Sequence, residues 1–214
     1  MLYIIGISIL LHFGESIANT NISYTNNFNK AFLEKLVPVN SDKLQECVLY
    51  SAKKTKCIPF NDFESQGQLA SFRDIFWAFS TSNIAHTDEL LIYGKNQKEN
   101  RALAALFFLA GQKKIWIWSN NNINQLVEVT GKASGSERQL FRSRVYLGKM
   151  REQFLVLKSQ IQKMKDQNWR LIDNPKSQSK HEKVIIQTKD VSTSLAVFAD
   201  LVASDYTNIK IIID

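Results

Sequence analysis

Residues 88–118, DELLIYGKNQKENRALAALFFLAGQKKIWIW, contain the pattern that decides the fold. The segment 89–93 is almost continuously apolar, which is typical of a strand buried on both faces of a parallel sheet. A polar turn separates it from an Ala- and Leu-rich helix that ends at Gly111, and a second apolar strand follows over 114–118. Strand, helix and strand in this order predict a βαβ unit, and therefore an α/β protein whose parallel sheet has helices on both faces.

The flanking segments extend the same pattern in both directions. Apolar spacing predicts a helix around 27–36, a short strand over 46–51 and a second helix over 67–84. After the βαβ unit, the spacing predicts a long amphipathic helix over 143–167 and a shorter one over 191–204. Three further strands are predicted, over 169–173, 183–187 and 209–214.

The segment 183–213 repeats the order strand, polar turn, helix and strand of 89–118. This indicates an internal duplication. The alternative is that any two βαβ units look alike. Between the halves, 131–140 is rich in Gly, Ser and charged residues, which favours a linker. We therefore expect a first domain over 19–130 and a second, shorter unit over 141–214.

The first eighteen residues have the form of an export signal. An apolar run over 2–13 precedes Ser16-Ile17-Ala18, which has the small-x-small form of a signal-peptidase site. We predict that residues 1–18 are removed and that the mature protein is exported, either periplasmic or secreted. The alternative is an uncleaved signal that anchors the chain to a membrane, because no Lys or Arg precedes the apolar run. No later segment approaches transmembrane length.

The net charge is +7, yet the sequence argues against nucleic acid as a partner. Lys and Arg are spread along the chain, and no aromatic residues alternate with a basic block. Cys47 and Cys57 are the two cysteines of the sequence. In an oxidising compartment a disulfide between Cys47 and Cys57 would close a short loop. The alternative is two small buried apolar side chains.

The sequence offers few groups for metal or acid–base chemistry. After the signal, the histidines are His86 and His181, one in each half and neither with a second His at ligand spacing. We therefore expect no metal and no cofactor. Asp173 and Asp190 follow predicted strands, and we expect both to bond to nearby backbone or to cap a helix rather than to catalyse.

Several segments resemble the rhodanese-like family, and specifically its tandem sulfurtransferases. The similar segments are DELLIYG (88–94), RALAALFFLAG (101–111), KKIWIW (113–118), WRLID (169–173) and an Ile-Pro turn, KCIPFNDF (56–63). The resemblance implies one full rhodanese-like unit and a second, abbreviated one. The second is short because only NPKSQSKHE lies between Asp173 and Lys183, where a full family domain would place a strand, a helix and the Ile-Pro turn.

The chemistry of that family depends on a cysteine at the end of the central strand, in a loop of backbone amides that opens a helix. Its thiolate attacks a sulfane sulfur and carries it as a persulfide. By resemblance, this position is Gly94 in the first unit and Thr188 in the second, and neither can hold a persulfide. We expect Gly94 to need a positive φ. Lys95, Lys98 and Arg101 make the loop a candidate site for a sulfate-like or phosphate-like anion. The alternative is a solvated polar loop.

Three functions remain open at this point. The first, which we prefer, is an exported rhodanese-like protein without catalytic activity that binds a small anion or a protein partner. The second is a sulfurtransferase or other thiol-dependent enzyme that uses Cys57, although neither a His nor a helix start lies beside it in sequence. The third is a structural envelope protein with no ligand.

Overall fold

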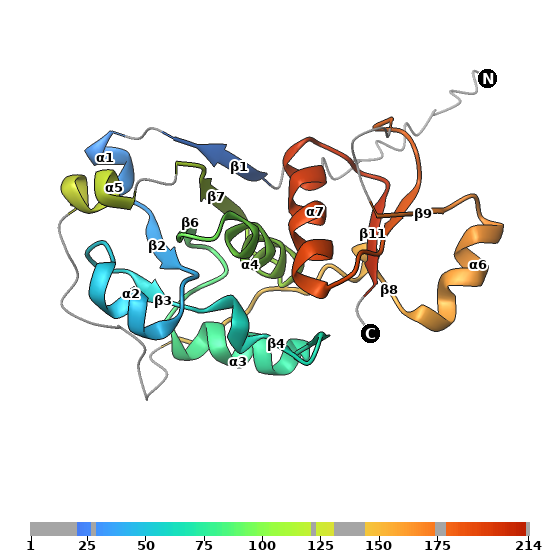
Figure 1. Cartoon of the computed structure of the whole chain (residues 1–214), viewed down its shortest axis with the longest axis horizontal. Helices are drawn as coiled ribbons and strands as arrows, with labels where there is room; N and C mark the ends of the chain where they lie inside the picture. The colour runs from blue at the N-terminus through green and yellow to red at the C-terminus, as the bar shows by residue number, and fades with distance from the viewer. Residues whose placement is uncertain (1–20, 27–28, 121–122, 131–143, 174–178, 213–214) are drawn as a thin grey trace, which may run out of the picture.

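The computed structural model describes residues 21–26, 29–120, 123–130, 144–173 and 179–212. These residues form two parallel sheets with helices packed around them, so the predicted α/β class is confirmed. Figure 1 shows the two sheets on either side of a central pair of helices. No helix in these ranges is long and apolar enough to span a bilayer. The predicted export signal and linker lie outside the described residues.

The first sheet has five parallel strands in the order β1-β7-β6-β2-β3. The central strand β6 pairs with β7 on one side and β2 on the other, and it is buried after its first residue. Its continuous apolar sequence follows from this position. The strands are β1 (Asn21–Thr25), β2 (Val37–Asn40), β3 (Lys56–Cys57), β6 (Glu89–Tyr93) and β7 (Lys114–Trp118).

Helix α4 (Gln97–Leu109) is buried on all sides from Ala102 to its end, while its first turn is partly exposed. It packs on β6 and β7 with one face and against α7 (Val191–Ala203) with another. The two helices lie side by side in the middle of the molecule (Figure 1). The part of α4 after Arg101 is apolar all round, which is typical of such a position. The remaining elements of this half are α1 (Lys30–Leu33), α2 (Leu44–Tyr50), η1 (Phe60–Asp62), β4 (Glu64–Ser65), β5 (Gln68–Leu69), α3 (Phe72–Thr81) and α5 (Ile123–Thr130).

The second sheet has four parallel strands in the order β8-β11-β10-β9. The predicted strands near the C-terminus are confirmed as β9 (Arg170–Ile172), β10 (Val184–Ile186) and β11 (Ile209–Ile212). Helix α7 connects β10 to β11, and both strands contact it. Four short elements precede β9; they are η2 (Glu152–Phe154), β8 (Leu155–Val156), η3 (Lys158–Gln160) and α6 (Ile161–Asp166).

The helix predicted over 67–84 is shorter in the structure, because Gln68–Leu69 form strand β5 paired with β4 and α3 begins at Phe72. Two other predicted elements differ more. The predicted strand over 46–51 belongs to helix α2, in which Cys47 is buried while Val48 and Leu49 are exposed. A short apolar run does not distinguish a strand from a helix. The predicted long helix over 143–167 is not formed in its described part, because 144–151 is irregular and several short elements follow.

Contacts with the first half hold the segment 144–151 out of a helical conformation. The backbone N–H of Tyr146 donates to Ser80 Oγ at 2.9 Å, and its hydroxyl donates to Gln112 Oε1 at 2.9 Å. Gly148 lies so close to the carbonyl of Ala110 that a Cβ at this position would overlap it. These tertiary contacts outweigh the helical spacing of the apolar residues.

Candidate functional site

The loop between β6 and α4 lies at the carboxyl end of the central strand of the first sheet. In parallel α/β sheets, ligands bind at this end of the strands. Gly94 directly follows β6, and Asn96 caps α4. The Asn96 side-chain oxygen accepts from the backbone N–H groups of Lys98 (3.0 Å) and Glu99 (3.5 Å). Two N–H groups at the start of the helix therefore already donate to the Asn96 side chain and are not free for a ligand.

Gly94 is enclosed by polar side chains. An added Cβ would lie 2.5 Å from Ser41 Oγ, 2.7 Å from Asn100 Oδ1 and 2.8 Å from Asp42 Oδ1. Ser41 Oγ donates to Asn100 Oδ1 at 2.5 Å, and Asn100 Nδ2 donates to the Gly94 carbonyl at 3.1 Å. Gly94 does not have a positive φ, so that expectation is wrong. Close packing, and not backbone conformation, requires a glycine here.

The loop amide that follows Gly94 holds a carboxylate of the same chain. The backbone N–H of Lys95 donates to Asp42 Oδ1 at 2.7 Å, and the Lys95 ammonium pairs with Glu46 at 2.8 Å. Asp42 is itself fixed by the hydrogen bond from its own N–H to Asn40 Oδ1 (2.7 Å). Burial raises the pKa of Asp42 and nearby Glu46 adds to this, while the Lys95 N–H opposes it. A carboxylate therefore occupies the place that the family pattern predicts for an anion.

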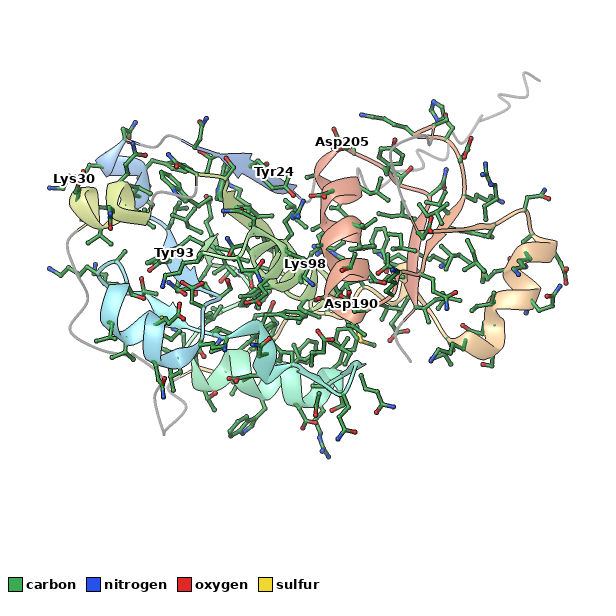
Figure 2. The ribbon with its side chains drawn as sticks, viewed as in Figure 1. Tyr24, Lys30, Tyr93, Lys98, Asp190 and Asp205 are labelled. Carbon is green, nitrogen blue, oxygen red and sulfur yellow. A yellow bond between two sulfur atoms is a disulfide. The ribbon has the colours of Figure 1, made fainter. Side chains whose placement is uncertain are left out.

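The other two basic residues of the predicted anion site point to different carboxylates. Lys98 Nζ lies 3.6 Å from Asp190 Oδ1, across to the start of α7 (Figure 2). Arg101 donates to Asp200 Oδ2 at 3.0 Å, and Asp200 also accepts a short hydrogen bond from the hydroxyl of Tyr24 on β1. Lys98 and Arg101 thus join α4 to α7 and do not converge on one point beside Gly94.

Thr188, the corresponding position of the second half, lies in a loop closed in a similar way. Its N–H donates to Ser194 Oγ at 3.0 Å, and its hydroxyl donates to the Asp190 carbonyl at 2.9 Å. Asp190 caps α7, as expected, by accepting from Thr193 N at 2.7 Å. A hydrogen bond from Ser192 is the main reason that the pKa of Asp190 falls to about 2. The residue six positions after Gly94 or Thr188 closes each loop.

Cys57, the alternative nucleophile, is joined to Cys47 by a disulfide with a Cα–Cα distance of 5.9 Å. The bond links the end of β3 to α2, and both cysteines are buried. Cys47 Sγ also lies 2.9 Å from Ser51 Oγ. In this oxidised form Cys57 has no thiolate with which to attack a substrate.

The histidines lie outside the loop. His86 is next to Tyr146, with 6.4 Å between the ring centroids, and His181 is exposed beside Asn208. Within the described ranges, no three His, Cys, Asp or Glu side chains are grouped so that they could hold a metal ion.

Sequence reasoning missed the three side chains that enclose Gly94. Ser41 and Asp42 follow β2, a strand that apolar spacing did not predict, and Asn100 lies within a polar segment interpreted as a turn. Asn100 is fully buried at the start of α4, and a buried amide requires hydrogen-bond partners. Its neighbours in sequence are polar as well, so nothing in the local sequence marks it out.

The sequence matches no protein-family model and no curated protein. Solved structures are nevertheless similar. SseA from Escherichia coli, described by its rhodanese fold and as a 3-mercaptopyruvate sulfotransferase, superposes with a TM-score of 0.69 at 8% identity, covering 89% of this chain and 98% of SseA. YnjE superposes with a TM-score of 0.63 at 11% identity, covering 92% of this chain and 60% of YnjE.

EanB in complex with ergothioneine superposes with a TM-score of 0.61 at 11% identity, covering 91% of this chain. The chain spans 66% of the length of EanB and 60% of the length of YnjE. At these identities the similarity shows the fold alone. The chain has the rhodanese fold, and its structural neighbours include rhodanese-fold sulfurtransferases.

Proposed function

We propose that this rhodanese-fold chain is an exported protein that does not transfer sulfur at the loop after β6 and that acts as an interaction module for a protein partner. The observation that carries the proposal is the closed environment of Gly94. Its side-chain space is filled by Ser41, Asp42 and Asn100. A persulfide site needs a thiolate, room for the sulfur and free donors around it. This loop has neither the thiol nor the room, and its Lys95, Lys98 and Glu99 amides already donate to side chains of the protein.

The same contacts argue against a small anion as the ligand. An anion at the loop would have to displace the Asp42 carboxylate from the Lys95 amide and would then lie beside it. Two like charges at such a distance repel. The proposal therefore prefers a protein partner to a small oxyanion.

An exposed apolar surface beside α3 supports the preference for a protein partner. Trp77 and Val145 are 55% and 56% exposed, and both line one open cavity of about 430 Å³. Leu147, two residues further on, is 70% exposed. Contiguous apolar side chains on a surface, and Trp above all, are typical of protein interfaces.

Two further parts of the proposal concern location. The Cys47–Cys57 disulfide supports a periplasmic or secreted protein, because such bonds persist in oxidising compartments. Membrane attachment, if any, is proposed only through an uncleaved signal, and nucleic acid is not proposed as a partner.

A sulfurtransferase assay tests the catalytic part. Thiosulfate and cyanide are supplied, and thiocyanate is measured for the wild type, Cys57→Ser and Cys47→Ser. We expect no turnover in any of them. Activity that survives Cys47→Ser and is lost in Cys57→Ser would establish the alternative, a thiol-dependent sulfurtransferase that uses Cys57.

A second experiment tests the anion part. Thiosulfate and sulfate should leave the melting temperature of the wild type unchanged relative to chloride at equal ionic strength. In Asp42→Ala, which frees the Lys95 amide, the same anions should raise it. A rise in the wild type that Asp42→Ala does not increase would favour an anion-binding protein.

The protein partner is tested by photo-crosslinking in the native host. A crosslinking residue replaces Trp77, and a matched one replaces Lys163 on the exposed helix α6. We expect an adduct of one defined mass from position 77 and none from position 163. Absence of any specific adduct would favour a structural protein without a partner.

A further inference from the structure

A second cavity, of about 410 Å³, lies between the two halves at the C-terminal end of α4. Phe108 of α4 contributes one wall, η2 another, and the last turn of α7 with β11 a third. The helix is 13 residues long, so about 20 Å separates this cavity from the Gly94 loop at its other end. The volume is in the range of small-molecule sites, which is roughly 300–1,000 Å³.

Four of the eleven residues that line the cavity are aromatic. Phe108 and Phe154 pack with 5.3 Å between their ring centroids, and Phe198 supports both from α7 at 5.8 and 5.7 Å. Trp169 and Tyr206, both half-buried, complete the aromatic lining. A flat unsaturated ligand could stack on such walls, because aromatic rings favour offset or edge contacts with one another.

Two cations face the cavity, and they have different roles. Arg151 donates to the carbonyls of Phe108 and Gln112, and its guanidinium lies 4.1 Å from the centroid of the Phe108 ring. It therefore satisfies carbonyl groups at the end of α4, as basic side chains commonly do at helix C-termini. Its position is fixed by the fold and needs no ligand.

Lys210 of β11 is held by one backbone carbonyl, whereas Arg151 is held by two. Its ammonium donates to the carbonyl of Gln153 and lies 5.2 Å from the centroid of the Trp169 ring. Among the described residues, no carboxylate forms an ion pair with it, and burial lowers its pKa. Asp205 lines the cavity too, but it is exposed beyond the end of α7 (Figure 2). A half-buried ammonium without a counter-ion favours an anionic ligand.

We infer that this cavity binds a small aromatic carboxylate, with the ring against the aromatic walls and the carboxylate on Lys210. The ligand gains a charge-assisted hydrogen bond and a cation beside its ring, and Lys210 gains a counter-ion that the described residues do not provide. This site does not depend on the loop after β6 and adds to the function proposed above.

Two probes of equal shape test the inference, namely 2-naphthoate and its uncharged analogue 2-naphthamide. The readout is the indole N–H resonance of Trp169 in the NMR spectrum of the full chain, identified as the resonance that Trp169→Phe removes. We expect 2-naphthoate to shift it saturably. The affinity for the amide should be about tenfold lower, because the amide cannot form the charge-assisted hydrogen bond.

Lys210→Met removes the charge and keeps most of the apolar stem. It should lower the affinity for 2-naphthoate to that for 2-naphthamide and leave the affinity for 2-naphthamide unchanged. The control variant Lys163→Met, on α6, should change neither affinity. Equal binding of both probes to the wild type, or no movement of the Trp169 resonance at millimolar probe, would overturn the inference. This comparison needs no variant at Lys210, so it stands even if Lys210→Met does not fold.

Discussion

Replacing Gly94 by Ala tests whether side chains have closed the loop after β6. The new Cβ would come within 2.5–2.8 Å of three polar atoms, on Ser41, Asp42 and Asn100. Overpacking of this kind costs about 1–3 kcal/mol. The loss of a glycine returns about 0.4–1 kcal/mol by restricting the unfolded chain, since Gly94 does not have a positive φ. We therefore expect Gly94→Ala to lower the free energy of unfolding by about 1–2 kcal/mol.

Urea unfolding followed by circular dichroism measures this change, provided that the m-value stays constant. Gly67→Ala is the matched control, because Gly67 has a φ of +78° and nothing within 4 Å of its Cβ position. The loss of stability in Gly67→Ala should therefore come from backbone conformation alone and not from overlap with neighbouring atoms. Adding Ser41→Ala should recover part of the loss in Gly94→Ala and none in Gly67→Ala. A change below about 0.5 kcal/mol in Gly94→Ala, or equal effects of Ser41→Ala on both, would refute the closed-loop argument.

Three other predictions concern processing, covalent state and pH. N-terminal sequencing of exported protein should begin at Asn19, and a start at residue 1 would indicate an anchor instead. Mass spectrometry of alkylated, unreduced protein should show Cys47 and Cys57 unmodified, and alkylation of both in native protein would exclude the disulfide. Replacing both by Ser should lower the free energy of unfolding by about 2.7 kcal/mol. The hydrogen bond from Ser192 lowers the pKa of Asp190 to about 2, so its stabilisation should be present above about pH 4 and be lost as pH falls toward 2. The stability difference between wild type and Asp190→Asn should therefore shrink over that interval, and a constant difference would contradict the assignment.

The local sequence pattern was sufficient to predict the elements that are mostly buried. The strands at 89–93 and 114–118 and the helix between them were predictable because burial leaves an unbroken apolar sequence. The segment 144–151 was not, because its conformation is set by contacts with Ser80, Gln112 and Ala110, which lie far away in sequence. Helix α2 was missed because its few apolar residues fit either a strand or a helix.

The position of the candidate site in the chain was predictable from the sequence, but the closed conformation of its loop was not. The strand-to-helix pattern located Gly94 but not the cap, because Asn96 lies in a segment interpreted as a polar turn. Whether the loop was open depended on Ser41 and Asp42, whose contacts with Asn100 and Lys95 span 59 and 53 residues of sequence. A hydrogen bond between such distant positions leaves no trace in local spacing. The same limit applies to the Lys210 cavity, whose walls come from α4, η2, α7 and β11.

The edge strand β1 ties the start of the described chain to its end. Within the described residues its sheet partner is β7, where Ile22 faces Ile115, and Tyr24 reaches Asp200 of α7 across 176 positions. A chain that emerges N-terminus first cannot complete its first sheet before β7 is made, nor close the contact between its halves before α7 is made. Such non-local closure slows folding. A product truncated before α7 would expose the apolar surfaces of α4 and β1 that α7 covers. Premature termination should therefore yield aggregates of the N-terminal half and not a smaller folded domain.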